Sequence, residues 1–238
     1  MAKANTVWKA HGNNPIEKLS PRLWRVEAGL PGSMPLRRVM AIAKRTDGGL
    51  VIHNGIVVDE PSIKQIEAWG PIAQIVEPNG WHRLDAKVFH DRYPDAKIIA
   101  PAGARKKVEE VVPVHATYAD VAPDSAVRHE YLDGFKEAEG IMVVKDEDGT
   151  TLIFTDAVFN MPHLHGTKGF VLKHITGSSG GPKVANLVRW FVIKDKKAYR
   201  AHLERLAAIP DLRRIVMSHH EVISTEPAAA LRKIATTL

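Results

Sequence analysis

The chain has 238 residues, a formal net charge of +6 and no cysteine. This length can build one large core that buries roughly three-quarters of the unfolded chain's surface. The lack of cysteine excludes disulfides, thiolate zinc sites and cysteine nucleophiles. A bound metal ion would therefore need His, Asp or Glu ligands, which suit zinc, manganese or iron.

The charge and apolar patterns favour a cytoplasmic protein with no membrane partner. Residues 1–19 carry charges but no apolar segment, and no apolar run approaches the roughly 20 residues that span a bilayer. Residues 157–238 hold thirteen Lys and Arg against five Asp and Glu, which raises the alternative of nucleic-acid binding. Aromatic residues do not interleave with these charges, so a solvated helix face is the preferred interpretation.

The first half of the chain predicts a hairpin followed by alternating strands and helices. Asp47-Gly48 separates two apolar runs, and Gly accepts the positive φ that tight hairpin turns require. Asp59 or Ser62 can cap the first helix, which Gly70-Pro71 ends. The alternation favours layers of helix and sheet. We expect strands at 23–28, 38–43, 50–52, 72–76 and 97–100, and helices at 59–69, 85–93 and 103–110.

The second half predicts a run of strands, an irregular stretch and then helices. Residues 177–181 are rich in Gly and Ser but do not fit the phosphate-binding loop pattern, so we expect a mobile loop beside the site. We expect strands at 127–132, 140–145, 151–155 and 212–217, and helices at 184–193, 196–209 and 227–235.

Two of the predicted strands end on residues that bind metals. Asp156 follows the apolar strand at 151–155, and His219 with His220 follows the strand at 212–217. His82 lies in the loop after the strand at 72–76. His163 and His165 are a further candidate pair, because alternate residues of an extended segment point the same way.

The order of these features resembles the metallo-β-lactamase superfamily over about residues 23–223. This resemblance rests on the Asp-Gly hairpin, Pro78-Asn79 followed by His82, Thr155-Asp156 followed by Phe159-Asn160, and Val216-Met217-Ser218-His219. It implies a four-layer αββα sandwich, formed as a single domain over 1–238 with an N-terminal extension at 1–20. In that superfamily one or two metal ions, usually zinc or iron, activate water to attack an ester, amide or phosphodiester.

The resemblance also implies a degenerate metal-binding signature. Asp156 and His219 match ligand positions of the superfamily. A further ligand position of the superfamily falls near Phe135 or Lys136. The main run of His and Asp ligands falls on residues that do not normally bind metal, namely Asn79, Trp81, Arg83 and Leu84. We expect Trp81 and Arg83 to fill the space that a metal occupies in the superfamily.

Two functions stay open on the sequence alone, both with a small-molecule ligand or substrate. In the first, the chain is a metallo-β-lactamase-like protein that lacks the usual dinuclear metal site, and it binds no metal at all. In the second, it is a divergent hydrolase of a small ester, lactone or phosphoester. That hydrolase would hold zinc or iron in a rearranged mononuclear site made by Asp156, His219 and His82, with His163, His165 and His220 as further candidates.

Overall fold

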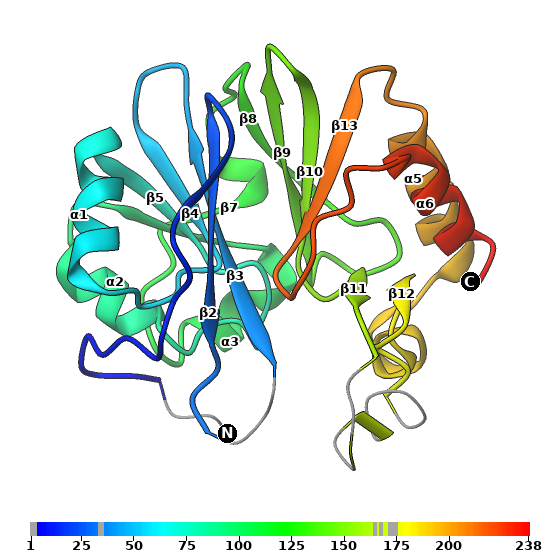
Figure 1. Ribbon diagram of the computed structural model, residues 1–238, viewed down its shortest axis with the longest axis horizontal. Coiled ribbons are helices and arrows are strands. Elements are labelled where there is room, and N and C mark those ends of the chain that lie inside the picture. The colour runs from blue at the N-terminus through cyan, green and yellow to red at the C-terminus, as the bar shows by residue number, and fades with distance from the viewer. Residues whose placement is uncertain (1–3, 33–35, 164–165, 167–168, 171–175) are drawn as a thin grey trace.

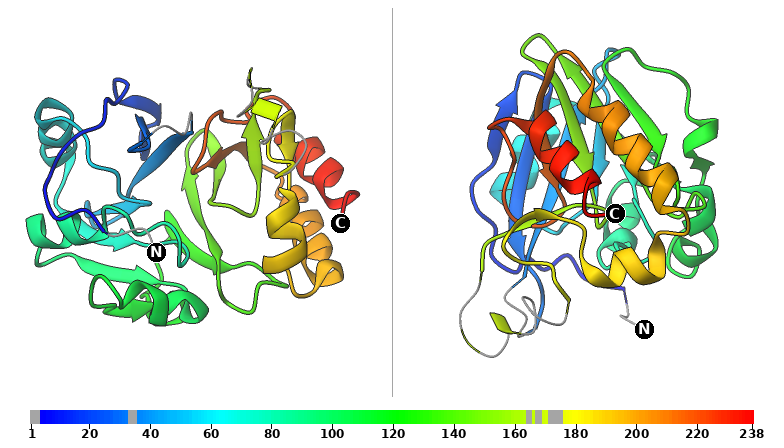
Figure 2. Two further views of the ribbon diagram at one scale, coloured as in Figure 1. Left: turned by 90° about the horizontal axis from the view of Figure 1, so that it is seen from below. Right: turned by 90° about the vertical axis from the view of Figure 1, so that its right-hand side faces the viewer.

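A computed structural model describes residues 4–32, 36–163, 166, 169–170 and 176–238. Two large β-sheets stand face to face, and helices cover the outer face of each sheet (Figures 1 and 2). The layers are thus helix, sheet, sheet and helix, which confirms the predicted αββα sandwich.

The first sheet has seven strands in chain order, antiparallel from β1 to β4 and parallel from β4 to β7. The predicted hairpin joins β3 to β4, and Gly48 at its turn has a φ of +87°. The strands are β1 (Glu17–Ser20), β2 (Leu23–Gly29), β3 (Arg37–Lys44), β4 (Leu50–His53), β5 (Ile72–Val76), β6 (Lys97–Ala100) and β7 (Ala116–Thr117).

Three helices lie in the connections of the first sheet: α1 (Glu60–Trp69), α2 (Ala86–Arg92) and α3 (Arg105–Val108). The Asp59 side chain caps α1 by accepting a hydrogen bond from the Ser62 backbone N–H at 2.9 Å. Ile63 and Ile66 form the buried face of α1, which packs this helix onto the sheet.

The second sheet has the strand order β13-β10-β9-β8, with β10 and β13 parallel. Helices α5 (Lys196–Ala207) and α6 (Pro227–Ala235) cover its outer face (Figure 1). The predicted helix at 184–193 includes a π-helical turn at Val188–Val192. The strands are β8 (Val127–Tyr131), β9 (Gly140–Asp146), β10 (Gly149–Phe154) and β13 (Leu212–Met217), and a separate pair is β11 (Phe159–Met161) with β12 (Gly181–Lys183).

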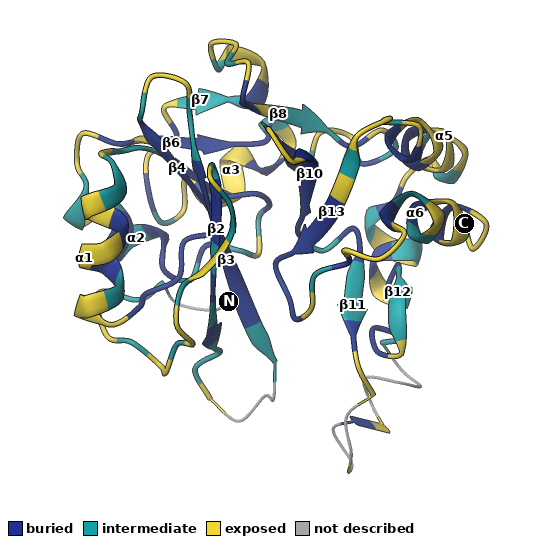
Figure 3. Cartoon of the chain, turned by 45° about the horizontal axis from the view of Figure 1, so that its top comes forward, coloured by how far each residue is buried: buried dark blue, intermediate teal, exposed yellow. Residues whose placement is uncertain are grey.

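Side-chain alternation along the strands divides the core into three layers, so both faces of the central strands are buried (Figure 3). In β3, Val39 and Ala41 face the other sheet, whereas Met40 faces the helices. In β10, Ile153 lies between the sheets and Phe154 faces α5 and α6. Strands that are covered on both faces have continuous apolar sequences. These apolar runs predicted the positions of the strands. Within the described residues, no helix has the length and apolarity needed to cross a bilayer.

Candidate metal site

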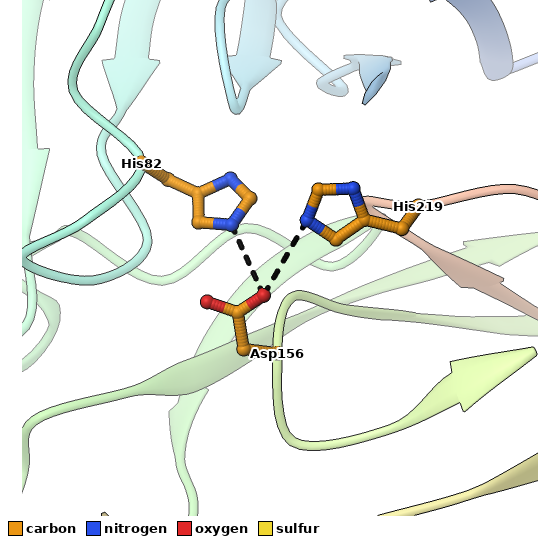
Figure 4. A group of neighbouring side chains, drawn as sticks. All are labelled: His82, Asp156 and His219. Carbon is orange, nitrogen blue, oxygen red and sulfur yellow. Dashed lines mark hydrogen bonds and ion pairs between the residues drawn. The ribbon is translucent and has the colours of Figure 1, made fainter. Parts of the chain in front are cut away.

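Three predicted ligands converge at one edge of the sandwich, where strand ends of both sheets meet (Figure 4). Asp156 and His219 follow β10 and β13, which are parallel neighbours, so the loops after them leave the sheet side by side. His82 comes from the loop that follows β5 in the opposite sheet. The site therefore forms only when the two sheets are packed together.

The three side chains point at a common centre. The Nε2 atom of His82 lies 3.1 Å from Asp156 Oδ1, and Nε2 of His219 lies 3.5 Å from the same oxygen. The three ligand atoms all lie within 4.8 Å of one another. Ligands of a tetrahedral zinc ion with bonds near 2.1 Å are about 3.4 Å apart. The two distances to Asp156 Oδ1 are thus close to the spacing of ligands that share one metal ion.

The orientation of the His219 ring is fixed by the first sheet. Its Nδ1 atom lies 2.9 Å from the carbonyl oxygen of Arg37. A carbonyl only accepts hydrogen bonds, so Nδ1 carries the proton and neutral His219 has its lone pair on Nε2. The Phe159 ring lies parallel to the imidazole, with the ring centroids 5.7 Å apart.

The His82 ring is fixed in a similar way. Its Nδ1 atom lies 2.9 Å from Oδ1 of Asn54. The Asn54 amide nitrogen donates to the Val39 carbonyl at 2.8 Å, and this bond determines which end of the amide faces His82. Neutral His82 therefore also has its lone pair on Nε2. Such outer partners are the usual way in which proteins orient metal-binding histidines.

Two imidazole lone pairs thus face one carboxylate oxygen. Three acceptors at this distance repel one another unless a proton or a metal cation lies among them. Burial alone would raise the pKa of Asp156. When the histidines carry protons in place of a metal, the charge of His82 and the hydrogen bonds with His219 and His82 outweigh that effect and hold this pKa well below its usual range. The carboxylate is therefore ionised and suited to bind a cation.

Glu139 and Asn79 hold the Asp156 carboxylate in place. Glu139 Oε1 accepts hydrogen bonds from the backbone N–H groups of Asp156 and Ala157, at 2.9 and 2.8 Å. The Asn79 amide nitrogen donates to Glu139 Oε2 at 3.1 Å and to Asp156 Oδ2 at 2.9 Å. Burial, with the charge of Asp156 as a second cause, raises the pKa of Glu139 to about 8.

The other predicted ligands lie outside this group. His220 is buried beside His219 in the chain but does not join the converging atoms, and the exposed His163 lies 3.1 Å through Nδ1 from the Ser179 hydroxyl. His165 falls outside the described residues. The prediction that Trp81 and Arg83 fill the site is wrong. Trp81 is 64% exposed, and Arg83 bonds to Glu110 at 2.9 Å.

Sequence reasoning missed Glu139 and Asn54. The sequence does carry one signal for Glu139, an acidic residue directly before the wholly apolar start of β9. Asn54 offers a weaker signal as an Asn after a strand, and its φ of +58° belongs to a region that Asn tolerates better than most residues.

Two cavities meet over Asp156. The smaller, of about 310 Å³, is lined by His82, His219 and Asn54, and the larger, of about 460 Å³, is lined by Glu139. Both share the side chains of Leu36, Trp81, Asp156 and Phe159. The candidate ligands therefore line space that a small molecule can enter.

The fold defines a class: the chain has the metallo-β-lactamase fold. Over 94% of this chain and 96% of the other, it is similar to a metallo-β-lactamase from Erythrobacter litoralis with β-mercaptoethanol in its active site, at 17% identity and a TM-score of 0.61. The DIM-1 metallo-β-lactamase exposed to ceftazidime gives 12% identity and a TM-score of 0.63, over 96% of this chain and 99% of the other.

A metallo-β-lactamase from Pontibacter korlensis gives 13% identity and a TM-score of 0.59, over 94% of this chain and 99% of the other. No known family model and no curated protein matches the sequence. At these identities the likeness establishes the fold alone.

Proposed function

We propose that this protein is a metal-dependent hydrolase with one metal ion held by His82, Asp156 and His219. One observation carries the proposal. The Nδ1 atoms of both histidines face acceptors, so both Nε2 lone pairs are aimed at the same oxygen of Asp156. The fold shared with metallo-β-lactamases supports a hydrolytic role.

The hydrogen bonds around Asn79 favour one metal ion over two. Asn79 donates to Asp156 Oδ2, which would be needed to bridge a second ion. The Asn79 carbonyl oxygen already accepts the backbone N–H groups of Trp81 and His82, at 2.9 and 3.0 Å. Within the described residues, His82, Asp156 and His219 are also the one group of three such ligands that converge.

The ligand set of two imidazoles and one carboxylate suits zinc or iron, and three protein ligands are typical of catalytic zinc sites. When bound, the metal supplies Lewis-acid polarisation of a carbonyl and lowers the pKa of water. The protein's own residues prepare the site. Asn54 and the Arg37 carbonyl fix the two imidazoles, Asn79 and Glu139 fix Asp156, and the Phe159 ring covers His219.

The charges around the site favour a neutral substrate. The ionised Asp156 lines both cavities, and Arg38 is the one Lys or Arg among the described residues that line either of the two. Arg38 is already bonded to Asp85 at 2.8 Å, so it is not free to bind a phosphate. We therefore assign a carboxylic ester or lactone as the substrate, ahead of a phosphoester.

Metal content and metal affinity test the proposal directly. Protein purified without added metal is analysed by mass spectrometry, and zinc binding is then measured by competition with a chromophoric chelator. We expect about one equivalent of metal, and an affinity reduced more than about 100-fold in Asp156→Ala and His219→Ala. His163→Ala is the matched control and should bind like the wild type, because His163 is exposed and outside the group.

A folded wild-type protein that binds less than about one-tenth of an equivalent of zinc or iron would refute the proposal. That result would favour the alternative that the chain kept the fold and binds its ligand without metal. Equal loss of affinity in His163→Ala would also contradict the assigned ligand set.

A further inference from the structure

The larger cavity beside the proposed metal site is polar at one end and apolar along its walls. Among the described residues that line it, Asp156 and Glu139 are the titratable ones, and both lie at the end near His82 and His219. Thr176 and Ser178 also contribute to the lining. The apolar walls are formed mainly by Leu36, Phe159, Leu187, Val188, Phe191 and Val192.

Some of these apolar side chains stay open to solvent at the rim of the cavity. Leu187 is 51% exposed, Phe191 is 66% exposed, and Trp81 is 64% exposed at the boundary with the smaller cavity. Large apolar side chains gathered around a cavity mark a binding surface, since leaving them in water forgoes the free energy of burial.

Leu187 and Phe191 line the cavity from one helical segment, which includes the π-helical turn at Val188–Val192. The backbone N–H of Ile193 bonds to the Val188 carbonyl at 3.0 Å, five residues earlier, and the buried Val188 ties the turn to the second core. Leu187 and Phe191 are four residues apart, so they share one side of the helix. Trp190, on the same turn, is 61% exposed but does not line the cavity.

We propose that this cavity binds the apolar acyl or aryl chain of a neutral ester or lactone. The polar end then receives the carbonyl group of this substrate at the candidate metal site. The acyl or aryl chain of the substrate lies along Phe159, Val188 and Phe191. The position of the carbonyl rests on the proposed hydrolase function. The binding of the chain rests on the cavity alone, because a deep apolar wall with a few polar groups at one end is the usual form of a small-molecule site.

We call the apolar part of the larger cavity, where the substrate's acyl or aryl chain would lie, the chain site. Binding of molecules that resist hydrolysis tests this site separately from catalysis. N-methyl alkanamides of increasing length are titrated against metal-free protein, with displacement of the neutral dye Nile red as the readout. Affinity should rise about fourfold for each added methylene until the cavity is filled, which corresponds to about 0.8 kcal/mol for each buried methylene.

Two variants and a matched control locate the binding. Phe191→Ser and Leu187→Ser should flatten the dependence on chain length, and Trp190→Ser should not, although all three positions are exposed to similar extents. Circular dichroism and melting temperature check that each variant folds. An affinity that does not rise with chain length would overturn the proposal, as would an equal loss in Trp190→Ser.

Hydrolysis of p-nitrophenyl esters of the same chain lengths, measured on zinc-loaded protein, separates the two proposals. Binding that depends on chain length without any ester hydrolysis would refute the hydrolase and leave the chain site standing. If neither the rate of ester hydrolysis nor the affinity for the amides depends on chain length, the chain site is refuted and the hydrolase proposal stands.

Discussion

Replacing Asn54 by glycine tests whether the outer hydrogen bond to His82 prepares the site for metal. Asn54 has a φ of +58°, which glycine adopts without strain, so Asn54→Gly removes the side chain and leaves the backbone relaxed. The variant loses the acceptor that lies 2.9 Å from His82 Nδ1, in a place where the His82 side chain is largely buried. The imidazole is then free to change tautomer and to rotate.

Loss of such an outer partner weakens metal binding by about 10- to 100-fold, which is about 1.4–2.7 kcal/mol. Zinc affinity at neutral pH is measured by chelator competition. Asn54→Asp is the matched control, because it keeps an acceptor oxygen for His82. Both variants lose the bond from the Asn54 amide nitrogen to the Val39 carbonyl, so the difference between them reports the acceptor oxygen together with the negative charge that Asp adds.

We expect Asn54→Asp to bind zinc within about threefold of the wild type. Wild-type affinity in Asn54→Gly would refute the argument from the histidine lone pairs. An equal loss in both variants would instead assign the effect to the bond with Val39.

Two further predictions concern stability. Burial, followed by the charges of His129 and His82, lowers the pKa of His53 to about 3. Between pH 6.5 and 3 the unfolded chain therefore binds a proton that the folded chain does not, and this costs up to about 1.4 kcal/mol per pH unit as pH falls. His53→Leu should flatten that decline in urea unfolding measured across this range, and an unchanged pH profile would contradict the assignment. Arg38→Met should cost about 3–5 kcal/mol because it leaves the buried Asp85 carboxylate without its cation, and the double variant Arg38→Met/Asp85→Leu should recover part of that loss. Urea unfolding of both variants checks this, and a single variant that loses less than about 1 kcal/mol would show that the pair contributes little.

The sequence located the strands that deliver Asp156 and His219 because β10 and β13 are buried on both faces and read as apolar runs. Only the resemblance placed the two residues in one site, and the structure gives the reason: β10 and β13 are neighbouring parallel strands that end at the same edge. The position of His82 in the loop after β5 made it a candidate ligand. Whether it reaches Asp156 and His219 depends on how the two sheets pack, and local sequence patterns carry no information about that packing.

Other features were beyond the sequence for physical reasons. The strands β11 and β12 are three residues each and contain Asn160 and Pro182, so they lack a period-2 apolar pattern. Glu139 acts through backbone N–H groups of the loop after β10, and such contacts leave no trace in residue spacing. The resemblance placed a family ligand near Phe135, whereas the structure buries that side chain against Tyr199 in the second core.

The origin of the three ligands in loops of both sheets has a consequence for the stability of the fold. His82 and Asp156 are 74 residues apart, so an ion held between them joins distant parts of a chain that has no cysteine. The ligands converge only in the folded chain, so an ion bound there would stabilise the fold by about 2.7 kcal/mol at a free metal concentration about 100 times its dissociation constant. Metal supply would therefore control the lifetime of the folded protein as well as its chemistry.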